Sequence, residues 1–305
     1  MQISKQKAAS RAAPSIAACY FRLPSAAWSV RSSRSMTQQH SPDLERRFGG
    51  LARLYGAEGA ARIRAARVAV VGIGGVGSWA AEALARSGVG AITLVDLDNV
   101  AESNVNRQIH ALTSTLGQPK VEAMRQRIAL IHPGCEVHCV EDFAAPGNWP
   151  ALLPAAVDGV IDACDQVHAK QALAAWALKT RALFITCGAA GGKRQGERVE
   201  IADLAEVTHD PLMAALRARL RQTGSMAKGG KDGKDRQARS GLHVVFSREA
   251  VTRPAACGPQ PGHDRNLNCH GYGSVVTVTA TFGLVAAGWM LERLAQGRAL
   301  QHPHT

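Results

Sequence analysis

The first 42 residues of this 305-residue chain contain no aspartate or glutamate, and the first acidic residue is Asp43. The stretch is rich in Ser and Ala and lacks the apolar core of roughly 7–15 residues that a secretory signal needs. Its composition is typical of an organellar transit peptide or of an unstructured or spurious extension, with Met36 as the alternative start. We expect residues 1–42 to take no part in the fold. They supply half of the formal net charge of +12, through Lys5, Lys7, Arg11, Arg22, Arg31 and Arg34.

The cysteines show no CxxC spacing, and their number is odd. A four-cysteine zinc knuckle is therefore unsupported, and a disulfide framework is not expected in a chain of this size without a secretory signal. This usage favours a reducing compartment, so we expect a cytoplasmic protein, and an organellar one only if the N-terminal stretch is a genuine transit peptide. The seven positions are Cys19, Cys135, Cys139, Cys164, Cys187, Cys257 and Cys269.

Long hydrophobic runs are scarce as well. The apolar segment 274–291 runs for eighteen residues without a charge, including three Thr and two Gly, and Glu292 and Arg293 follow it. A span usually needs about 20 strongly apolar residues. We therefore expect a helix over 274–294 in a buried core or dimer interface, and no stable membrane span.

What the sequence does contain is an alternation of short apolar runs and amphipathic segments from Arg67 onward. This pattern predicts a Rossmann-like, doubly wound α/β fold, with a mostly parallel sheet, helices on both faces and a C-terminal α+β extension. We expect strands over 67–71, 91–95, 136–140, 159–161, 183–186, 198–201 and 242–246, and helices over 76–87, 120–131, 166–179 and 211–220. The expected divisions are a Rossmann-like domain over 43–196, a C-terminal part over 197–296 with a low-complexity basic loop over 222–241, and a tail over 297–305.

The strongest local signal is the G-x-G-x-x-G motif that follows the first expected strand and opens a helix. Gly72 permits a tight turn, Gly74 and Gly75 let a phosphate approach the backbone, and Gly77 allows the helix and strand to pack closely. Asp96 ends the next strand and is placed to bind ribose hydroxyls. Taken alone, the motif is also typical of an NAD- or FAD-dependent oxidoreductase.

The residues after the motif favour phosphate chemistry over hydride transfer. Two acids, Asp96 and Asp98, are followed by Asn104, Arg107 and Gln108, and then by Lys120 and Asp165. Cations that grip a triphosphate, together with an acid able to hold Mg²⁺, suit a nucleotide-cleaving site. The same segment has no evident role around a dinucleotide.

These stretches resemble the adenylating fold of the ThiF/MoeB/ubiquitin-activating-enzyme superfamily. The similarity rests on GIGGVGSWAAEALARSGVGAITLVDLDNV, SNVNRQ and GQPKVEAM, and it spans roughly residues 43–294. Three further stretches, RFGGLARLYG, NRQIHAL and VTATFG, resemble the tRNA threonylcarbamoyladenosine dehydratase subgroup.

The resemblance implies an ATP-dependent enzyme that adenylates a carboxylate with Mg²⁺. It places the glycine loop, Asn104, Arg107 and Lys120 on the phosphates, with Arg107 at the α-phosphate, and Asp96 on the ribose hydroxyls. Asp98 and Gln108 are further candidate ATP-binding residues. Asp165 would carry Mg²⁺, with Asp162 a weaker candidate, and the catalytic set would be Arg107, Lys120 and Asp165. A homodimer is also implied, in which Arg46, Arg47 or Arg53 is a candidate to reach the other subunit's site.

For the dehydratase subgroup, the implied substrate is the threonyl carboxylate of threonylcarbamoyladenosine in tRNA, which is activated and then cyclised. The +6 net charge beyond residue 42 favours an RNA partner. The candidate RNA contacts are Arg217, Arg219, Lys228, Lys231, Lys234, Arg236 and Arg239. The alternatives are an activating enzyme for a ubiquitin-like or sulfur-carrier protein and a non-catalytic nucleotide-binding adaptor.

The remaining reactive side chains have weaker signals. Cys257 and Cys269 are candidates for sulfur or redox chemistry with a cysteine desulfurase system, which the resemblance makes conceivable, whereas Cys187 ends an expected strand and reads as a packed thiol. The spacing of His243, His263 and His270 does not indicate a metal site, and we expect structural or surface roles for them.

Overall fold

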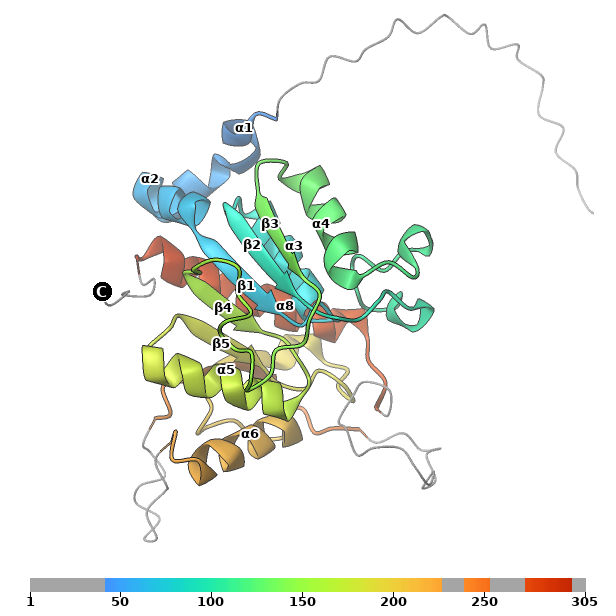
Figure 1. Cartoon of the computed structure of the whole chain (residues 1–305), viewed down its shortest axis with the longest axis vertical. Coiled ribbons are helices and arrows are strands. Elements are labelled where there is room, and N and C mark those ends of the chain that lie inside the picture. The colour runs from blue at the N-terminus through green and yellow to red at the C-terminus, as the bar shows by residue number, and fades with distance from the viewer. Residues whose placement is uncertain (1–41, 227–238, 253–271, 298–305) are drawn as a thin grey trace, which may run out of the picture. The chain divides into compact units, whose positions relative to one another are not determined.

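The computed structural model describes residues 42–226, 239–252 and 272–297, and within them seven strands form one sheet (Figure 1). Their order across the sheet is β3-β2-β1-β4-β5-β7-β6. Every neighbouring pair is parallel except β6 and β7, which are antiparallel. The strands are β1 Arg67–Val71, β2 Ala91–Val95, β3 Glu136–Val140, β4 Gly159–Asp162, β5 Phe184–Cys187, β6 Val199–Asp203 and β7 His243–Ser247.

Helices cover both faces of this sheet because its strands are apolar on both sides. In β1, Val68 and Val70 pack into one core with α3, α4 and α8, while Ala69 and Val71 pack into a second core with α5 and α6. The helices are α1 Leu44–Phe48, α2 Gly50–Ala65, α3 Gly77–Arg86, α4 Lys120–Ile131, α5 Val167–Thr180, α6 Pro211–Gln222 and α8 Val276–Ala295, with short 3-10 turns at Glu102–Asn104, Thr113–Thr115 and Gly196–Arg198.

The Rossmann-like, doubly wound fold predicted from the sequence is confirmed. The predicted bounds of the strands over 67–71, 91–95 and 136–140 and of the helix over 120–131 match the structure, and most other elements differ by one or two residues at an end. The helix predicted over 76–87 begins at Gly77 and ends at Arg86, because Ser87 and Gly88 already leave the helical conformation.

The C-terminal part continues the same sheet. β7 pairs in parallel with β5, and β6 adds an antiparallel edge strand. The apolar segment forms α8, which is buried against α3: a Cβ at Gly283 would lie 2.3 Å from the Val76 carbonyl oxygen, so only glycine permits this approach. Among the described residues, no helix is both long enough and apolar enough to cross a membrane.

The predicted N-terminal extension and C-terminal tail fall almost wholly outside the described residues, as do positions 227–238 of the basic loop and the segment 253–271. The helix before the sheet, α2, carries one non-helical residue, Gly56, at φ 74° and ψ 165°. A positive φ of this kind is open to glycine and strained for other residues, so the chain bends there.

Candidate functional site

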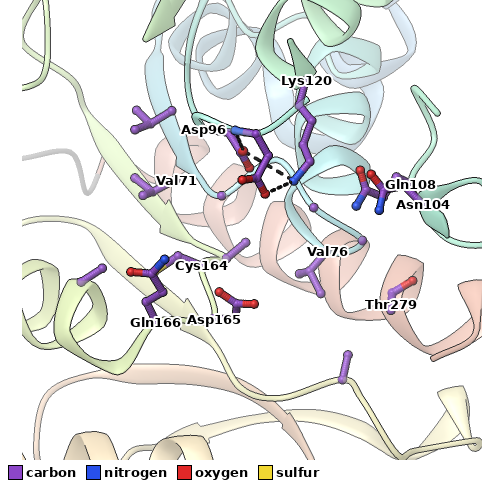
Figure 2. A pocket seen from close by; sticks show the side chains of 18 of the residues that line it. Val71, Val76, Asp96, Asn104, Gln108, Lys120, Cys164, Asp165, Gln166 and Thr279 are labelled. Atoms are coloured by element: carbon purple, nitrogen blue, oxygen red, sulfur yellow. Dashed lines mark hydrogen bonds and ion pairs between the residues drawn. The ribbon is translucent and has the colours of Figure 1, made fainter. Parts of the chain in front are cut away.

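A cavity of about 550 Å³ opens at the carboxyl ends of the parallel strands, where the strand order reverses between β1 and β4. In open α/β sheets this switch point leaves a crevice, since the chain departs to opposite faces from neighbouring strands. The walls come from the residues that follow β1, β2, β3, β4 and β5, together with α4 and α8 (Figure 2). The fold therefore brings together side chains that lie far apart in the sequence.

The glycine-rich turn forms the floor of this cavity. Gly72 has φ +86°, and a Cβ there would lie 2.8 Å from the Cys164 backbone nitrogen, so the turn requires glycine. A Cβ on Gly74 would meet no atom of the described residues within 4 Å, because Gly74 faces the open cavity. Among the described residues no side chain caps the start of α3, although the Ser78 backbone nitrogen donates to the Gly74 carbonyl at 3.1 Å. The helix start can therefore meet an anion through its dipole and its remaining N–H groups.

Gly77 has a different role from the other glycines of the motif. A Cβ on this residue would lie 1.8 Å from the Gly72 carbonyl oxygen, and Gly77 does not line the cavity. Because Gly77 has no side chain, α3 can pack on the turn, as predicted. The proposed phosphate contacts are therefore made by Gly72, Gly74 and Gly75.

A buried carboxylate and a buried ammonium face each other at one side of the cavity. Asp96 accepts hydrogen bonds from the Ile73 backbone nitrogen at 2.6 Å and from the Asp98 backbone nitrogen at 2.9 Å. Lys120 Nζ lies 2.6 Å from Asp98 Oδ2 and 3.5 Å from Asp96 Oδ1, and Figure 2 shows it pointing from the start of α4 toward Asp96. Burial raises the pKa of Asp96 above its usual value, and Lys120 and the two N–H groups oppose that rise.

The segment between β2 and α4 supplies a second cation, Arg107. Its Nη1 donates to the Ser103 carbonyl at 2.7 Å and to Asn106 Oδ1 at 3.0 Å, and its side chain lies over Gly75. Both partners are neutral oxygens, and among the described residues no carboxylate lies within 4.0 Å of its guanidinium. Its charge therefore stays available for an anionic ligand.

Asn104 and Gln108, which lie close to Arg107 in the sequence, line the same cavity (Figure 2). Asn104 Oδ1 accepts from the Ala101 backbone nitrogen at 3.0 Å, which fixes the turn that carries Arg107. Gln108 is 5% exposed, and within the described structure its Oε1 has no hydrogen-bond partner. A buried amide oxygen without a partner is costly, so a ligand or water donor is expected to meet it.

Of the two acids at the end of β4 and in the loop that follows, only Asp165 faces the cavity. It is exposed and lies across the cavity from Lys120 (Figure 2). Asp162, the weaker candidate for a metal ligand, is fully buried and does not line the cavity. The sequence-based suggestion for Asp162 is therefore corrected, because its carboxylate is engaged in a buried network below the loop.

That network is centred on Lys170 of α5, which is also fully buried. Lys170 Nζ donates to Asp162 Oδ2 at 3.1 Å and to Thr186 Oγ1 at 3.0 Å, and the Thr186 hydroxyl donates to Asp162 at 2.7 Å. Burial alone would lower the pKa of Lys170, but Asp162, together with Cys164 and Cys187, raises it above its usual value. The Cys164 backbone nitrogen and thiol donate to the other Asp162 oxygen, so this pair holds the loop that presents Asp165.

The chemistry of the cavity suits Mg²⁺ bound through a nucleotide. Among the described residues, no group of three His, Cys, Asp or Glu side chains could hold a metal alone. Magnesium is commonly bound by one or two carboxylates plus substrate phosphates and waters. Three exposed acids line the cavity, but Asp98 pairs with Lys120, and Asp142 accepts from the Phe143 backbone nitrogen and the Asn148 amide. That leaves Asp165, opposite Lys120, as the exposed carboxylate that fits this pattern.

The candidate RNA contacts divide into three groups. Arg217 Nη1 donates to the Leu204 and Val207 carbonyls at 2.9 and 3.0 Å, so part of its hydrogen bonding holds the chain before α6. Arg219 lies against the His168 ring, with nitrogen–nitrogen distances of 3.2 and 3.3 Å, and Arg239 is exposed. Lys228, Lys231, Lys234 and Arg236 lie outside the described residues.

The candidate cysteines and histidines, like the candidate RNA contacts, lie partly within and partly outside the described residues. Cys187 is 2% exposed and burial raises its pKa to about 12, which confirms the packed thiol. His243 packs against Trp289 with ring centroids 4.9 Å apart. Cys257, Cys269, His263 and His270 lie outside the described residues.

Of the arginines proposed to act across a dimer, Arg46 and Arg53 are exposed. Arg47 Nη1 donates to the Ile131 carbonyl of its own chain at 2.6 Å. The structure describes one protomer, so the dimer and these contacts stay predictions.

Several cavity residues were not predicted from the sequence. Phe143 follows β3 and Gly188–Gly191 follow β5, and the rule that ligands bind at the carboxyl ends of parallel strands could have pointed to both. Thr279 reaches the cavity from α8, where its methyl group would lie 3.3 Å from a Cβ on Gly75. No local signal identifies Thr279, because its position depends on how α8 crosses α3.

Together these groups form a site for a nucleoside triphosphate. Backbone N–H groups and two cations face a position for phosphates, a buried carboxylate accompanies the turn where a ribose is bound in such folds, and one carboxylate is free for a cation. Such a site can stabilise negative charge that develops at a phosphorus atom during nucleotidyl transfer.

Comparison with known proteins gives a consistent result. The model of the ThiF family matches residues 47–304. The chain is 42% identical over 262 residues to the tRNA threonylcarbamoyladenosine dehydratase of Escherichia coli K12, covering 84% of this chain and 96% of that protein, and 38% identical to the Haemophilus influenzae protein of the same name with the same coverage. The crystal structure of the E. coli enzyme, TcdA, in complex with ATP covers 85% of this chain and 97% of that one at 41% identity, with a TM-score of 0.73.

Proposed function

The chain belongs to the ThiF family, and we propose that it catalyses the ATP-dependent dehydration of threonylcarbamoyladenosine in tRNA. In this reaction the threonyl carboxylate is adenylated, and the activated acyl group is attacked from within the same side chain. A ring closes and AMP leaves, so the nucleoside loses one water. The similarity to dehydratases extends over nearly their whole length, which supports the proposal for the entire catalytic unit.

One observation carries the proposal. The cavity places an arginine without a carboxylate partner in the described structure, Arg107, beside the glycine turn, and it places Lys120 and Asp165 on opposite sides (Figure 2). A related enzyme has been crystallised with ATP and with AMP, the substrate and a product expected of adenylation. We therefore propose that this chain binds ATP in the same cavity.

Each residue then has a defined task in the first step. The glycine turn and the start of α3 hold the phosphates. Asp96 accepts hydrogen bonds from the ribose hydroxyls, which replace its contact with the Lys120 ammonium. Lys120 turns from Asp98 to the phosphates. Arg107 neutralises the charge that builds on the α-phosphate as the carboxylate oxygen attacks and pyrophosphate leaves.

We propose that Mg²⁺ accompanies ATP and that Asp165 holds it. The exposed carboxylate of Asp165 fits a hard cation that keeps waters and phosphate oxygens among its ligands. Bound there, the ion would offset the charge of the leaving pyrophosphate. Asp162 stays paired with Lys170 and acts by holding the loop.

The proposed macromolecular partner is tRNA. The net charge of +6 beyond residue 42, and exposed cations such as Arg239, supply the phosphate contacts that RNA binding requires. We also propose a homodimer in which Arg46 or Arg53 reaches the second site. A sulfur-transfer partner acting on Cys257 or Cys269 remains a proposal from the family resemblance alone.

The test is to incubate the purified protein with ATP, Mg²⁺ and tRNA that carries threonylcarbamoyladenosine. We expect AMP and pyrophosphate in equal amounts and a nucleoside lighter by one water. Arg107→Ala should abolish both signals, and Gln195→Ala, on an exposed loop outside the cavity, should leave them unchanged. An unchanged nucleoside mass with the wild-type protein would contradict the proposal. Pyrophosphate exchange that requires a Gly-Gly-ended protein instead of tRNA would support the alternative, activation of a ubiquitin-like or sulfur-carrier protein.

A further inference from the structure

Asn106 joins the candidate catalytic arginine to a segment that lies far away in the sequence. Its Oδ1 accepts from Arg107 Nη1 at 3.0 Å, and its Nδ2 donates to the Ser274 carbonyl at 3.0 Å. The two contacts fix the orientation of the amide, because the flipped amide would set N–H against N–H and oxygen against oxygen. One side chain therefore contacts both the guanidinium and the chain just before α8.

The segment that Asn106 holds is itself tied to the cavity wall. Gly192 donates its N–H to the Gly273 carbonyl at 3.0 Å, and its own carbonyl accepts from the Thr252 backbone nitrogen at 2.8 Å. Gly192 follows Gly191, which lines the cavity. The residues on either side of 253–271 thus meet at one point of the wall, and Asn106 extends that junction to the arginine.

Asn106 shares the placement of the Arg107 guanidinium with one backbone carbonyl, and it is the one side chain among the described residues that hydrogen-bonds the guanidinium. The Trp79 indole donates to the Arg107 carbonyl at 2.9 Å, which fixes the backbone, and the Ser103 carbonyl accepts from the same Nη1. A neutral amide can hold the guanidinium without cancelling its charge, whereas a carboxylate would form an ion pair and compete with phosphate. An asparagine at position 106 therefore orients the Arg107 guanidinium and leaves its charge available for phosphate.

We infer that Asn106 is a positioning residue that sets the direction of the Arg107 guanidinium toward the nucleotide phosphates by bridging it to Ser274. The inference rests on the proposed function for the role of Arg107. It adds a residue that lines no part of the cavity and acts only through its neighbour.

A double-mutant cycle tests this relation. The variants are Asn106→Ala, Arg107→Ala and the pair, and the readouts are the dissociation constant for ATP with Mg²⁺, by calorimetry, and the rate of AMP formation with modified tRNA. In the wild-type background we expect Asn106→Ala to weaken ATP binding by about threefold to tenfold and to slow AMP formation by about tenfold or more. In the Arg107→Ala background, where AMP formation is already lost, it should leave the dissociation constant for ATP unchanged.

A matched control and the opposing results complete the design. Gln195 accepts from Arg198 Nη1 at 3.1 Å, so Gln195→Ala removes an arginine–amide contact of the same kind on an exposed loop, and it should leave ATP binding unchanged. An equal effect of Asn106→Ala in both backgrounds, or a loss of thermal stability with no change in ATP binding, would overturn the inference. A wild-type protein that binds ATP but releases no AMP from modified tRNA would contradict the proposed function alone, because the binding cycle can still be read.

Discussion

Lys120 Nζ lies 2.6 Å from the partly exposed Asp98 carboxylate and 3.5 Å from the buried Asp96 carboxylate, so one ammonium neutralises charge on both acids.

Removing the Lys120 ammonium should weaken both ligand binding and folding stability. We expect Lys120→Met to weaken ATP binding at least tenfold and to lower the free energy of unfolding by about 3 kcal/mol, since the buried acid loses its cation. Calorimetry and urea unfolding measure the two effects. Asp98→Asn, the control, should cost much less stability, and unchanged ATP affinity in Lys120→Met would argue against a phosphate role.

Two glycines of the same motif should respond differently to the same substitution. A methyl group on Gly74 meets open cavity, so Gly74→Ala should fold normally and weaken ATP binding by at least about tenfold, because the methyl occupies the phosphate position. On Gly77 it meets the Gly72 carbonyl oxygen, so Gly77→Ala should lower the free energy of unfolding by about 2 kcal/mol or more. Thermal melts with and without ATP distinguish the two. Equal loss of stability in both variants would contradict this division.

Substituting Asp162, which ends β4, and Asp165, in the loop after it, should have different effects on stability and on Mg²⁺ dependence. Asp165→Asn is expected to leave the melting temperature unchanged and to remove most of the Mg²⁺ dependence of ATP binding, because its carboxylate is exposed in the cavity. Asp162→Asn should lower the free energy of unfolding by roughly 3 kcal/mol, because it leaves the fully buried Lys170 without its counter-charge. Titrating Mg²⁺ into each variant, alongside urea unfolding, provides the comparison. A stable Asp162→Asn protein that has lost its Mg²⁺ response would reverse the assignment.

His110 should make folding stability depend on pH. It is 1% exposed, and burial, with help from Lys120 and Arg127, lowers its pKa from 6.5 to about 4. The unfolded state therefore takes up a proton below about pH 6.5 while the folded state does not until about pH 4, so stability falls as the pH drops through that window and levels off below it. At pH 5 the loss amounts to about 2 kcal/mol.

His110→Leu should remove that part of the pH dependence. In the described structure neither ring nitrogen of His110 has a partner, so the apolar variant loses no hydrogen bond. Urea unfolding at pH 8 and pH 5 measures the difference, and His209→Asn, at an exposed residue whose positive φ asparagine tolerates, is the control. A wild-type slope retained in His110→Leu would show that another group is responsible.

The alternation of apolar strands and amphipathic helices was enough to predict the fold, since period and turn signals are local properties. It also predicted the cavity residues that directly follow β1 and β2, such as Gly74 and Asp96. The buried pair of Asp162 and Lys170 could not be predicted, because a lysine in a helix gives no sign that its ammonium is buried under the neighbouring loop.

Contacts between distant segments were likewise beyond local signals. The hydrogen bond from Asn106 to Ser274 joins residues 168 positions apart, and it exists only because α8 packs beside α3. Thr279 reaches the cavity for the same reason. Arg217 was a candidate RNA contact on charge alone, and only the fold shows its guanidinium turned to the Leu204 and Val207 carbonyls.

The most direct test of the central claim follows one oxygen atom. If the threonyl carboxylate is adenylated, one of its oxygens bonds to the α-phosphorus and leaves with AMP when the ring closes. With tRNA whose threonyl carboxylate carries ¹⁸O, mass spectrometry should find the label in AMP and none in pyrophosphate. Labelled inorganic phosphate with ADP, or unlabelled AMP beside a cyclised nucleoside, would contradict activation by adenylation.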